Sequence, residues 1–177
     1  PLTPADVLTT VIQAPLVEET AKGLGVLMLV FARRSHFDGP LDGIVYAGEV
    51  GAGFAFTENI LYFSAALFEA GGVGLQLGSV FVLRGLFSPF AHVLFTAAIG
   101  LALGIAVRRP GAGRITGGFA AGLAAAVAGH MFWNGGMALV ADDFFAFYFL
   151  LQVPLFALAV GGVTWLRRQE QRLTGQR

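Results

Sequence analysis

Glu18 and Glu19 are adjacent carboxylates inside an otherwise apolar stretch, and Lys22 follows them. Carboxylates within a membrane segment are costly and rare, so they mark candidate functional sites. Lys22 lies four residues after Glu18 and three after Glu19, which is the spacing of neighbours on one helix face. The ammonium group can neutralise one carboxylate and leave the other as a base able to activate water. An intrahelical ion pair that only supports packing is the structural alternative.

Further polar side chains interrupt the apolar segments downstream. His130 and Asn134 are four residues apart and share a helix face, as do Glu58 and Tyr62. The remaining polar candidates are Asn59, Arg84 and His92. Single polar groups in membrane helices commonly hydrogen-bond to a neighbouring helix. We therefore expect the residues around Glu58 to fix helix packing, and the two histidines to act together with the glutamate pair.

The composition is that of a membrane protein. Apolar residues make up 56% of the 177-residue chain, charged residues only 12%, and the mean hydropathy is +0.74. The formal net charge is zero, which argues against nucleic acid as a partner. There are no cysteines, so disulfides, thiolate metal sites and cysteine nucleophiles are excluded.

The hydropathy pattern predicts an all-α fold, a polytopic transmembrane helix bundle of about five spans. A span needs roughly 20 helical residues. The predicted spans cover residues 7–32, 42–68, 88–107, 115–140 and 144–166. The glycine-rich stretch 71–86 is either an interfacial helix or an early start of the third span. Small residues four apart predict close helix packing at Gly100 with Gly104 and at Gly118 with Gly122, and the same is expected of Gly48, Gly51 and Gly53.

The charged loops predict an orientation in the membrane. Arginines follow the first, third and fifth predicted spans, whereas acidic residues (Glu69, Asp142 and Asp143) follow the second and fourth. Under the positive-inside rule, the N-terminus lies outside and the C-terminus in the cytoplasm. At about 1.5 Å per residue, Glu18, Glu58 and His130 then lie roughly 15 Å below the outer edge, with His92 shallower. We therefore expect the polar groups to meet in the outer half of the bilayer.

The sequence around these residues resembles the PrsW family of intramembrane proteases, within the wider group of CAAX prenyl endopeptidases and bacteriocin-processing proteins. The resemblance rests on Pro15-Leu-Val-Glu-Glu-Thr-Ala-Lys22, Asp42-Gly-Ile-Val-Tyr-Ala-Gly48 continued by Gly53-Phe-Ala-Phe-Thr-Glu-Asn-Ile-Leu-Tyr62, Arg84 through Pro89 to His92, and His130-Met-Phe-Trp-Asn134. It implies a single membrane-embedded protease domain over residues 1–177. Because the chain starts with Pro1, we expect N-terminal spans to be missing from it.

The resemblance also implies roles for the residues. Glu18 would be the general base, assisted by His92; Glu19, paired with Lys22, would orient it. His130 and Asn134 would form the oxyanion pocket. Two positions depart from the CAAX pattern, which has an arginine one residue after the position of Lys22 and a phenylalanine where this chain has Ser88. The implied substrate is a membrane-anchored regulator, such as an anti-sigma factor, cut near the outer side of a bacterial or archaeal plasma membrane.

Three alternatives stay open. Two glutamates and two histidines also suit a zinc ion, although the chain lacks the HExxH string that places two histidine ligands on one helix. Metal-free glutamate catalysis is favoured, with no cofactor required. A non-catalytic membrane scaffold, and a transporter with a proton relay, are the other function classes. The complete set of base, histidines and oxyanion donors favours a protease over both.

Overall fold

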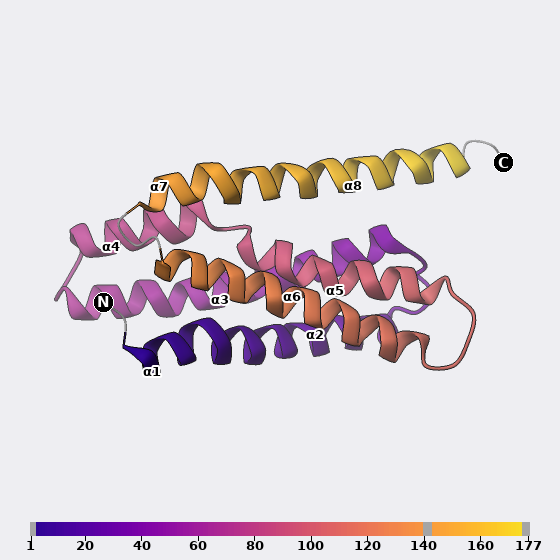
Figure 1. Ribbon diagram of the computed structural model, residues 1–177, viewed down its shortest axis with the longest axis horizontal. Helices are drawn as coiled ribbons and strands as arrows, with labels where there is room; N and C mark the ends of the chain where they lie inside the picture. The colour runs from indigo at the N-terminus through magenta and orange to yellow at the C-terminus, as the bar shows by residue number, and fades with distance from the viewer. Residues whose placement is uncertain (1–2, 140–142, 175–177) are drawn as a thin grey trace.

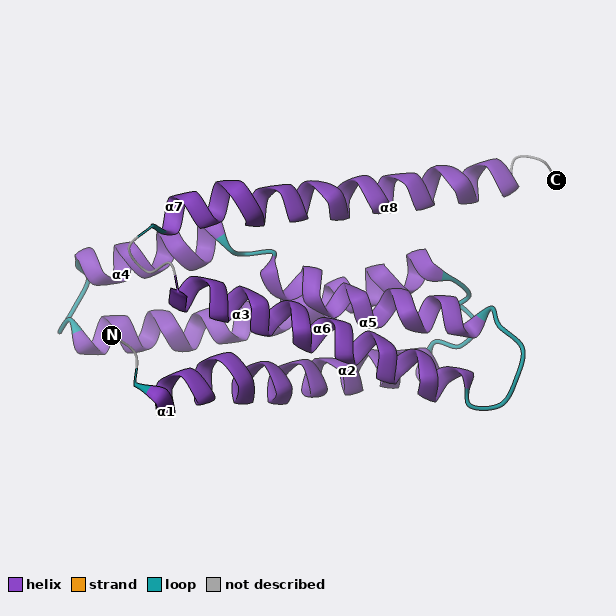
Figure 2. Cartoon of the chain, viewed as in Figure 1, coloured by secondary structure: helices purple, strands orange, loops and turns teal. Residues whose placement is uncertain are grey.

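The computed structural model describes residues 3–139 and 143–174, and within these ranges all regular structure is helical, as predicted. Five helical segments run back and forth along the long axis of the described part of the chain (Figure 1, Figure 2). They comprise α1 (Pro4–Val7), π-helical η1 (Leu8–Gln13) and α2 (Ala14–Ala32); α3 (Pro40–Glu69); α4 (Leu75–Val80), π-helical η2 (Phe81–Phe87) and α5 (Ala91–Val107); α6 (Arg114–Leu139); and α7 (Phe144–Phe147), π-helical η3 (Tyr148–Gln152) and α8 (Val153–Thr174).

Proline and glycine mark the ends of the segments. Pro40 begins α3 at a position where its missing N–H is not needed, after an extended Gly39. Gly71 follows α3 with a φ of 66°, a left-handed conformation that favours glycine in the turn to α4. Pro89 lacks a backbone N–H and lies in the short break between η2 and α5. This break offsets α5 from η2 and brings His92 to the first turn of α5.

Glycines allow α3, α5 and α6 to pack closely. A Cβ atom on Gly43 would overlap the Gly100 carbonyl oxygen of α5, and one on Gly122 would lie 2.7 Å from the Ile99 Cα atom. The packing predicted for Gly100, Gly104, Gly118, Gly122 and Gly51 is confirmed, since an added Cβ at each would be too close to a neighbouring helix. Gly48 makes an ordinary contact and Gly53 faces open space, so the prediction is wrong for these two. Such contacts replace the hydrophobic effect as the source of helix association in lipid.

Three helical segments in the described part of the chain are long and apolar enough to cross a membrane. They are Leu75–Val107, Arg114–Leu139 and Phe145–Arg172. Because the first of them includes residues 75–86 of the stretch 71–86, the finding favours an early start of the third span over an interfacial helix. The two N-terminal segments carry Glu18, Glu19, Lys22, Glu58 and Asn59 of the polar cluster, which lower their hydropathy. That they also cross the membrane, making five spans, stays a prediction.

The three basic segments lie at one end of the helix bundle. The loops between α2 and α3 and between α5 and α6, and the C-terminal end of α8, are side by side in Figure 1. Arg108 links them: its Nε donates to the Asp38 carbonyl at 2.8 Å, and its Nη2 lies 3.0 Å from Glu170 Oε1. This arrangement is the one that the positive-inside rule needs. The side of the membrane on which it lies stays a prediction, and Asp142 is outside the described residues.

Candidate active site

Glu18 and Glu19 of α2 point into different surroundings. Glu19 is fully buried between α2, α5 and α6, whereas the Glu18 side chain keeps 19% of its surface exposed and faces a cavity. Adjacent helical residues differ by about 100° in direction, so one helix can supply both environments. The two carboxylates therefore have different partners.

Glu19 is saturated with hydrogen bonds. Its Oε1 accepts from Lys22 Nζ at 2.5 Å and lies 2.9 Å from His130 Nδ1, while its Oε2 accepts from Thr96 Oγ1 at 3.4 Å. A buried carboxylate is tolerated when it is paired and hydrogen-bonded in this way. Glu19 thus connects α2 to both α5 and α6.

Lys22 lies between the two halves of the cluster. Its Nζ is 2.8 Å from His92 Nδ1, 3.7 Å from Glu18 Oε2 and 4.3 Å from the centre of the Phe54 ring. The side chain is almost completely buried, at 2% exposure. Helical spacing predicted that Lys22 could pair with either glutamate. In the structure it contacts Glu19 directly and lies farther from Glu18.

On the other side of His92, three polar residues of α3 meet the π-helical turn η2. His92 Nε2 is 2.9 Å from Glu58 Oε2, which also accepts a hydrogen bond from Arg84 Nη2. Arg84 Nε donates to Asn59 Oδ1 at 3.1 Å, and its guanidinium carbon lies 3.7 Å from the centre of the Tyr62 ring. Arg84, predicted as a supporting residue, lies in η2. This turn belongs to the stretch 71–86, for which the sequence allowed either an interfacial helix or the start of the third span.

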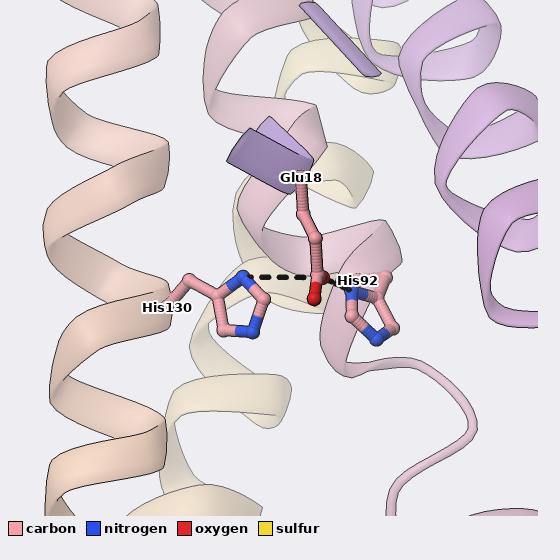
Figure 3. Close-up of side chains that lie close together, drawn as sticks. All are labelled: Glu18, His92 and His130. Carbon is pink, nitrogen blue, oxygen red and sulfur yellow. Dashed lines mark ion pairs between the residues drawn. The ribbon is translucent and has the colours of Figure 1, made fainter. Parts of the chain in front are cut away.

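Glu18 lies between the two histidines (Figure 3). Its Oε2 is 3.9 Å from His92 Nδ1 and 4.0 Å from His130 Nδ1, and both rings turn this nitrogen toward it. These distances are too long for direct hydrogen bonds. The Oε2 atom is buried and has no hydrogen-bond partner in the described part of the chain. A buried acceptor of this kind needs an occupant such as water or a metal ion.

A cavity of about 570 Å³ adjoins these groups. Its polar lining includes Glu18, Glu58, Asn59, Tyr62, Arg84, His92, His130 and Asn134, while Glu19 and Lys22 lie behind its wall. Asn134 is held in place because its Nδ2 donates to the Thr10 carbonyl oxygen of η1 at 2.9 Å. Two of the π-helical turns, η1 and η2, contribute to the wall, and such turns are frequent at functional sites.

Sequence reasoning missed several neighbours of the site, among them Thr96 and Phe95. Thr96 contacts Glu19 and lies four residues after His92, so the same spacing argument that joined His130 to Asn134 would have found it. Phe95 stacks on the His130 ring with centroids 5.0 Å apart, and nothing in the spacing of polar residues indicates it.

The donor set also fits a zinc ion. Glu18, His92 and His130 each offer one ligand atom, and these atoms lie within 4.8 Å of one another. One carboxylate and two histidines are a common catalytic zinc set. The unpartnered Oε2 of Glu18 agrees with this, and His92 contacts a further carboxylate, Glu58, through its other ring nitrogen, as histidine ligands of metals usually do. The Lys22 ammonium beside His92 Nδ1 is an unfavourable neighbour for a cation.

An apolar helical bundle with glutamates and histidines around a cavity defines the class as a polytopic membrane protein with a polar site among its helices. Residues 2–159 match the PrsW family, described as intramembrane metalloproteases. The chain belongs to this family, which confirms that part of the resemblance.

Curated relatives agree with the family. The chain is 37% identical over 87 residues to protease PrsW of Clostridioides difficile strain 630, covering 49% of this chain and 34% of that protein. It is 36% identical over 88 residues to protease PrsW of Bacillus subtilis strain 168, covering 50% and 35%. The chain thus spans about a third of the length of the curated relatives it matches, at 34% and 35%. No solved structure matches it.

Proposed function

We propose that this protein is an intramembrane endopeptidase that hydrolyses a peptide bond of a membrane-anchored substrate. Membership of the PrsW family supports the class of reaction. The observation that carries the proposal is the unpartnered Glu18 Oε2, which lies between two histidines on the wall of a cavity. A carboxylate in this position has a free acceptor for a water molecule, and the cavity has room for a peptide segment.

In the proposed reaction, Glu18 is the general base and His92 assists it. Glu18 takes a proton from water while the water oxygen attacks the peptide carbonyl carbon. The peptide C–N bond then breaks, and the leaving amine receives the proton that Glu18 took up. His130, when protonated, and the second N–H of Asn134 are the proposed donors to the carbonyl oxygen as it gains negative charge.

Glu19 has a different part in this scheme. Its contacts support a role in holding His130 and Lys22 rather than in orienting Glu18 directly, because its two oxygens are engaged with these residues and Thr96. We propose that Glu19 sets the ring of His130 and that Lys22 balances the charge of the buried pair.

A zinc-dependent reaction on the same residues is the second candidate, favoured by the family description and by the grouping of Glu18, His92 and His130. These three side chains would hold the ion, and a bound zinc ion would polarise the substrate carbonyl and lower the pKa of a bound water. The protein's own groups would still have to bind the peptide, orient it and move its protons.

The substrate and the cell location are proposed more broadly. By resemblance, the substrate is a membrane-anchored regulator of the anti-sigma-factor type, cut near the extracytoplasmic side of a bacterial or archaeal plasma membrane. The pair His130 and Asn134 agrees with the HxxxN pattern of the CAAX endopeptidases and supports a place in that wider group. The N-terminus of the chain would then lie outside and the C-terminus in the cytoplasm.

The test is cleavage of a single-span model substrate by purified protein in nanodiscs. Glu18→Gln and His92→Ala are compared with wild type and with Glu49→Gln, a control that neutralises an exposed carboxylate of α3 outside the cavity lining. We expect both site variants to lose cleavage and the control to keep it. Insensitivity to a chelator supports the metal-free reaction, and loss with the chelator that zinc restores supports the zinc reaction. Cleavage that survives both site substitutions contradicts the assignment.

A further inference from the structure

The contacts of Lys22 and Glu58 together favour one position for the hydrogen of the neutral His92 ring. A lysine ammonium has three donors and no acceptor. Because Lys22 Nζ lies 2.8 Å from His92 Nδ1, that nitrogen must accept the hydrogen bond and carries no hydrogen. The hydrogen of the neutral ring is therefore on Nε2, from which it is donated to Glu58 Oε2 at 2.9 Å. Lys22 and Glu58 thus favour the same tautomer from opposite sides of the ring.

Arg84 holds Glu58 in the position that this hydrogen bond requires. Both Arg84 Nη2 and His92 Nε2 contact the same oxygen, Glu58 Oε2. Arg84 is itself fixed by Asn59 and by the face of Tyr62. A guanidinium group cannot accept a hydrogen bond, so an acceptor atom must face both Arg84 and His92. The order of contacts from η2 to the site is Arg84, Glu58, His92.

His130 provides the contrast. Its Nδ1 lies 2.9 Å from Glu19 Oε1, a carboxylate oxygen that also accepts from Lys22, so this nitrogen carries the hydrogen. The two histidines that flank Glu18 are therefore held in opposite tautomers when neutral. His92 directs its Nδ1 lone pair to Lys22, and His130 directs its Nδ1–H to Glu19.

We propose that Glu58, held by Arg84, is the positioning residue that keeps His92 in the Nε2–H tautomer with an unprotonated Nδ1 on the side of Glu18. The unprotonated Nδ1 accepts the hydrogen bond from Lys22, whose Nζ lies 3.7 Å from Glu18 Oε2, so this tautomer holds the ammonium group beside the proposed base. The consequence for catalysis rests on the proposed function, but the tautomer itself does not. The role is one of orientation, comparable to that of carboxylates behind other active-site histidines.

Nitrogen NMR of ¹⁵N-histidine-labelled protein in nanodiscs tests the tautomer directly. The chain has only three histidines, and the third, His36, is exposed in the loop after α2 and serves as an internal reference. We expect the neutral wild-type protein to show a protonated Nε2 at His92 and a protonated Nδ1 at His130. A protonated Nδ1 at His92 in the wild type would overturn the proposal.

Variants of Glu58 separate positioning from packing. Glu58→Leu removes the acceptor and should give a mixture of tautomers at His92, whereas Glu58→Gln keeps an oxygen that Arg84 orients and should keep the Nε2–H form. Glu69→Leu removes another carboxylate of α3, one that accepts from Gln76, and should leave the His92 signal unchanged. Arg84→Met keeps Glu58 but removes the guanidinium group that donates to it. This variant should give a smaller increase in the Nδ1–H tautomer of His92 than Glu58→Leu does. It also serves as the test if Glu58→Leu does not fold.

Cleavage kinetics give the second measurement. We expect Glu58→Leu to lower kcat by about 10- to 100-fold with KM nearly unchanged, and Glu58→Gln to recover much of the loss. An unchanged His92 tautomer in both Glu58→Leu and Arg84→Met overturns the positioning role, whatever the activity. If the wild-type protein cleaves no substrate, but the Glu58→Leu and Arg84→Met variants change the His92 tautomer, the proposed function is contradicted and the positioning role is supported.

Discussion

The buried half of the polar cluster and its cavity-facing half use the same residue type in different ways. Glu19 has hydrogen bonds to both oxygens and no exposed surface, whereas Glu18, one residue earlier, has a buried oxygen with no partner in the described part of the chain. A saturated carboxylate can hold helices together but has no free acceptor for a reactant. An unsaturated one can take up a proton at little structural cost. Under the proposed function, structure and chemistry are therefore divided between two adjacent residues of one helix.

Replacing Glu18 by glutamine should give the largest effect on activity and almost none on stability. The substitution removes the proposed base, and general-base catalysis contributes about 10²- to 10⁴-fold to rate, so we expect kcat to fall by about 10³-fold. Because Glu18 Oε2 makes no hydrogen bond, little native structure depends on its charge. Cleavage assays and thermal unfolding in the same nanodiscs check both parts. A marked fall in the unfolding temperature would show that Glu18 is a structural residue like Glu19, and would contradict the proposed difference between the two glutamates.

Replacing Glu19 by alanine should instead lower the free energy of unfolding of the helix bundle. The substitution leaves the Lys22 ammonium buried without its nearest carboxylate, which costs about 3–5 kcal/mol when one partner of a buried pair is removed. The double variant Glu19→Leu with Lys22→Met removes both charges and should recover most of that stability but not activity. Unfolding in graded denaturing detergent gives the comparison. Equal stability of the single and double variants would show that the pair is not coupled.

Much of the fold could be predicted from the sequence because membrane helices follow hydropathy and loop charge. The predicted segments 42–68 and 115–140 match α3 and α6 to within two residues at each end. The predicted segment 88–107 matches α5, and the apolar helix begins earlier, at Leu75, in agreement with one of the two interpretations of the stretch 71–86. The break near Pro89 makes the start of this span hard to predict, because it divides one long apolar segment into two helices.

The contacts within the site could be predicted only along each helix. Spacing placed Lys22 next to both glutamates but could not choose between them, because the choice depends on how α2 is rotated against α5 and α6. The pairing of Arg84 with Glu58 joins two segments, and no local pattern encodes it. Thr96, in contrast, lies four residues after His92 and was within reach of the spacing rule. Helix rotation, rather than helix identity, is what the single sequence leaves undetermined.

Asn134 belongs to both halves of the comparison, because it lines the cavity and also donates a hydrogen bond to η1. Removing one oxyanion donor costs about 10²- to 10³-fold in kcat in other hydrolases, so Asn134→Ala should lower kcat by about 100-fold if the proposed role is correct. The lost hydrogen bond to the Thr10 carbonyl should cost only about 1 kcal/mol of stability. Asn134→Gln, which keeps the amide but displaces it, is the matched variant. A loss of stability without a fall in kcat would assign Asn134 to packing alone.

Replacing Thr96 should have the smallest effect on kcat and stability, because this residue makes the longest hydrogen bond to Glu19 in the buried half of the cluster. Its Oγ1 is 3.4 Å from Glu19 Oε2, near the upper limit for a hydrogen bond, and Glu19 keeps two closer partners. Thr96→Val preserves the shape of the side chain and removes only this donor, so we expect a loss of about 1 kcal/mol and a kcat within about threefold of wild type. Thr96→Ser keeps the donor and is the control. If Thr96→Val lowered kcat as strongly as a change at Glu18, the buried half would take part in the chemistry, and the division between the two glutamates would be wrong.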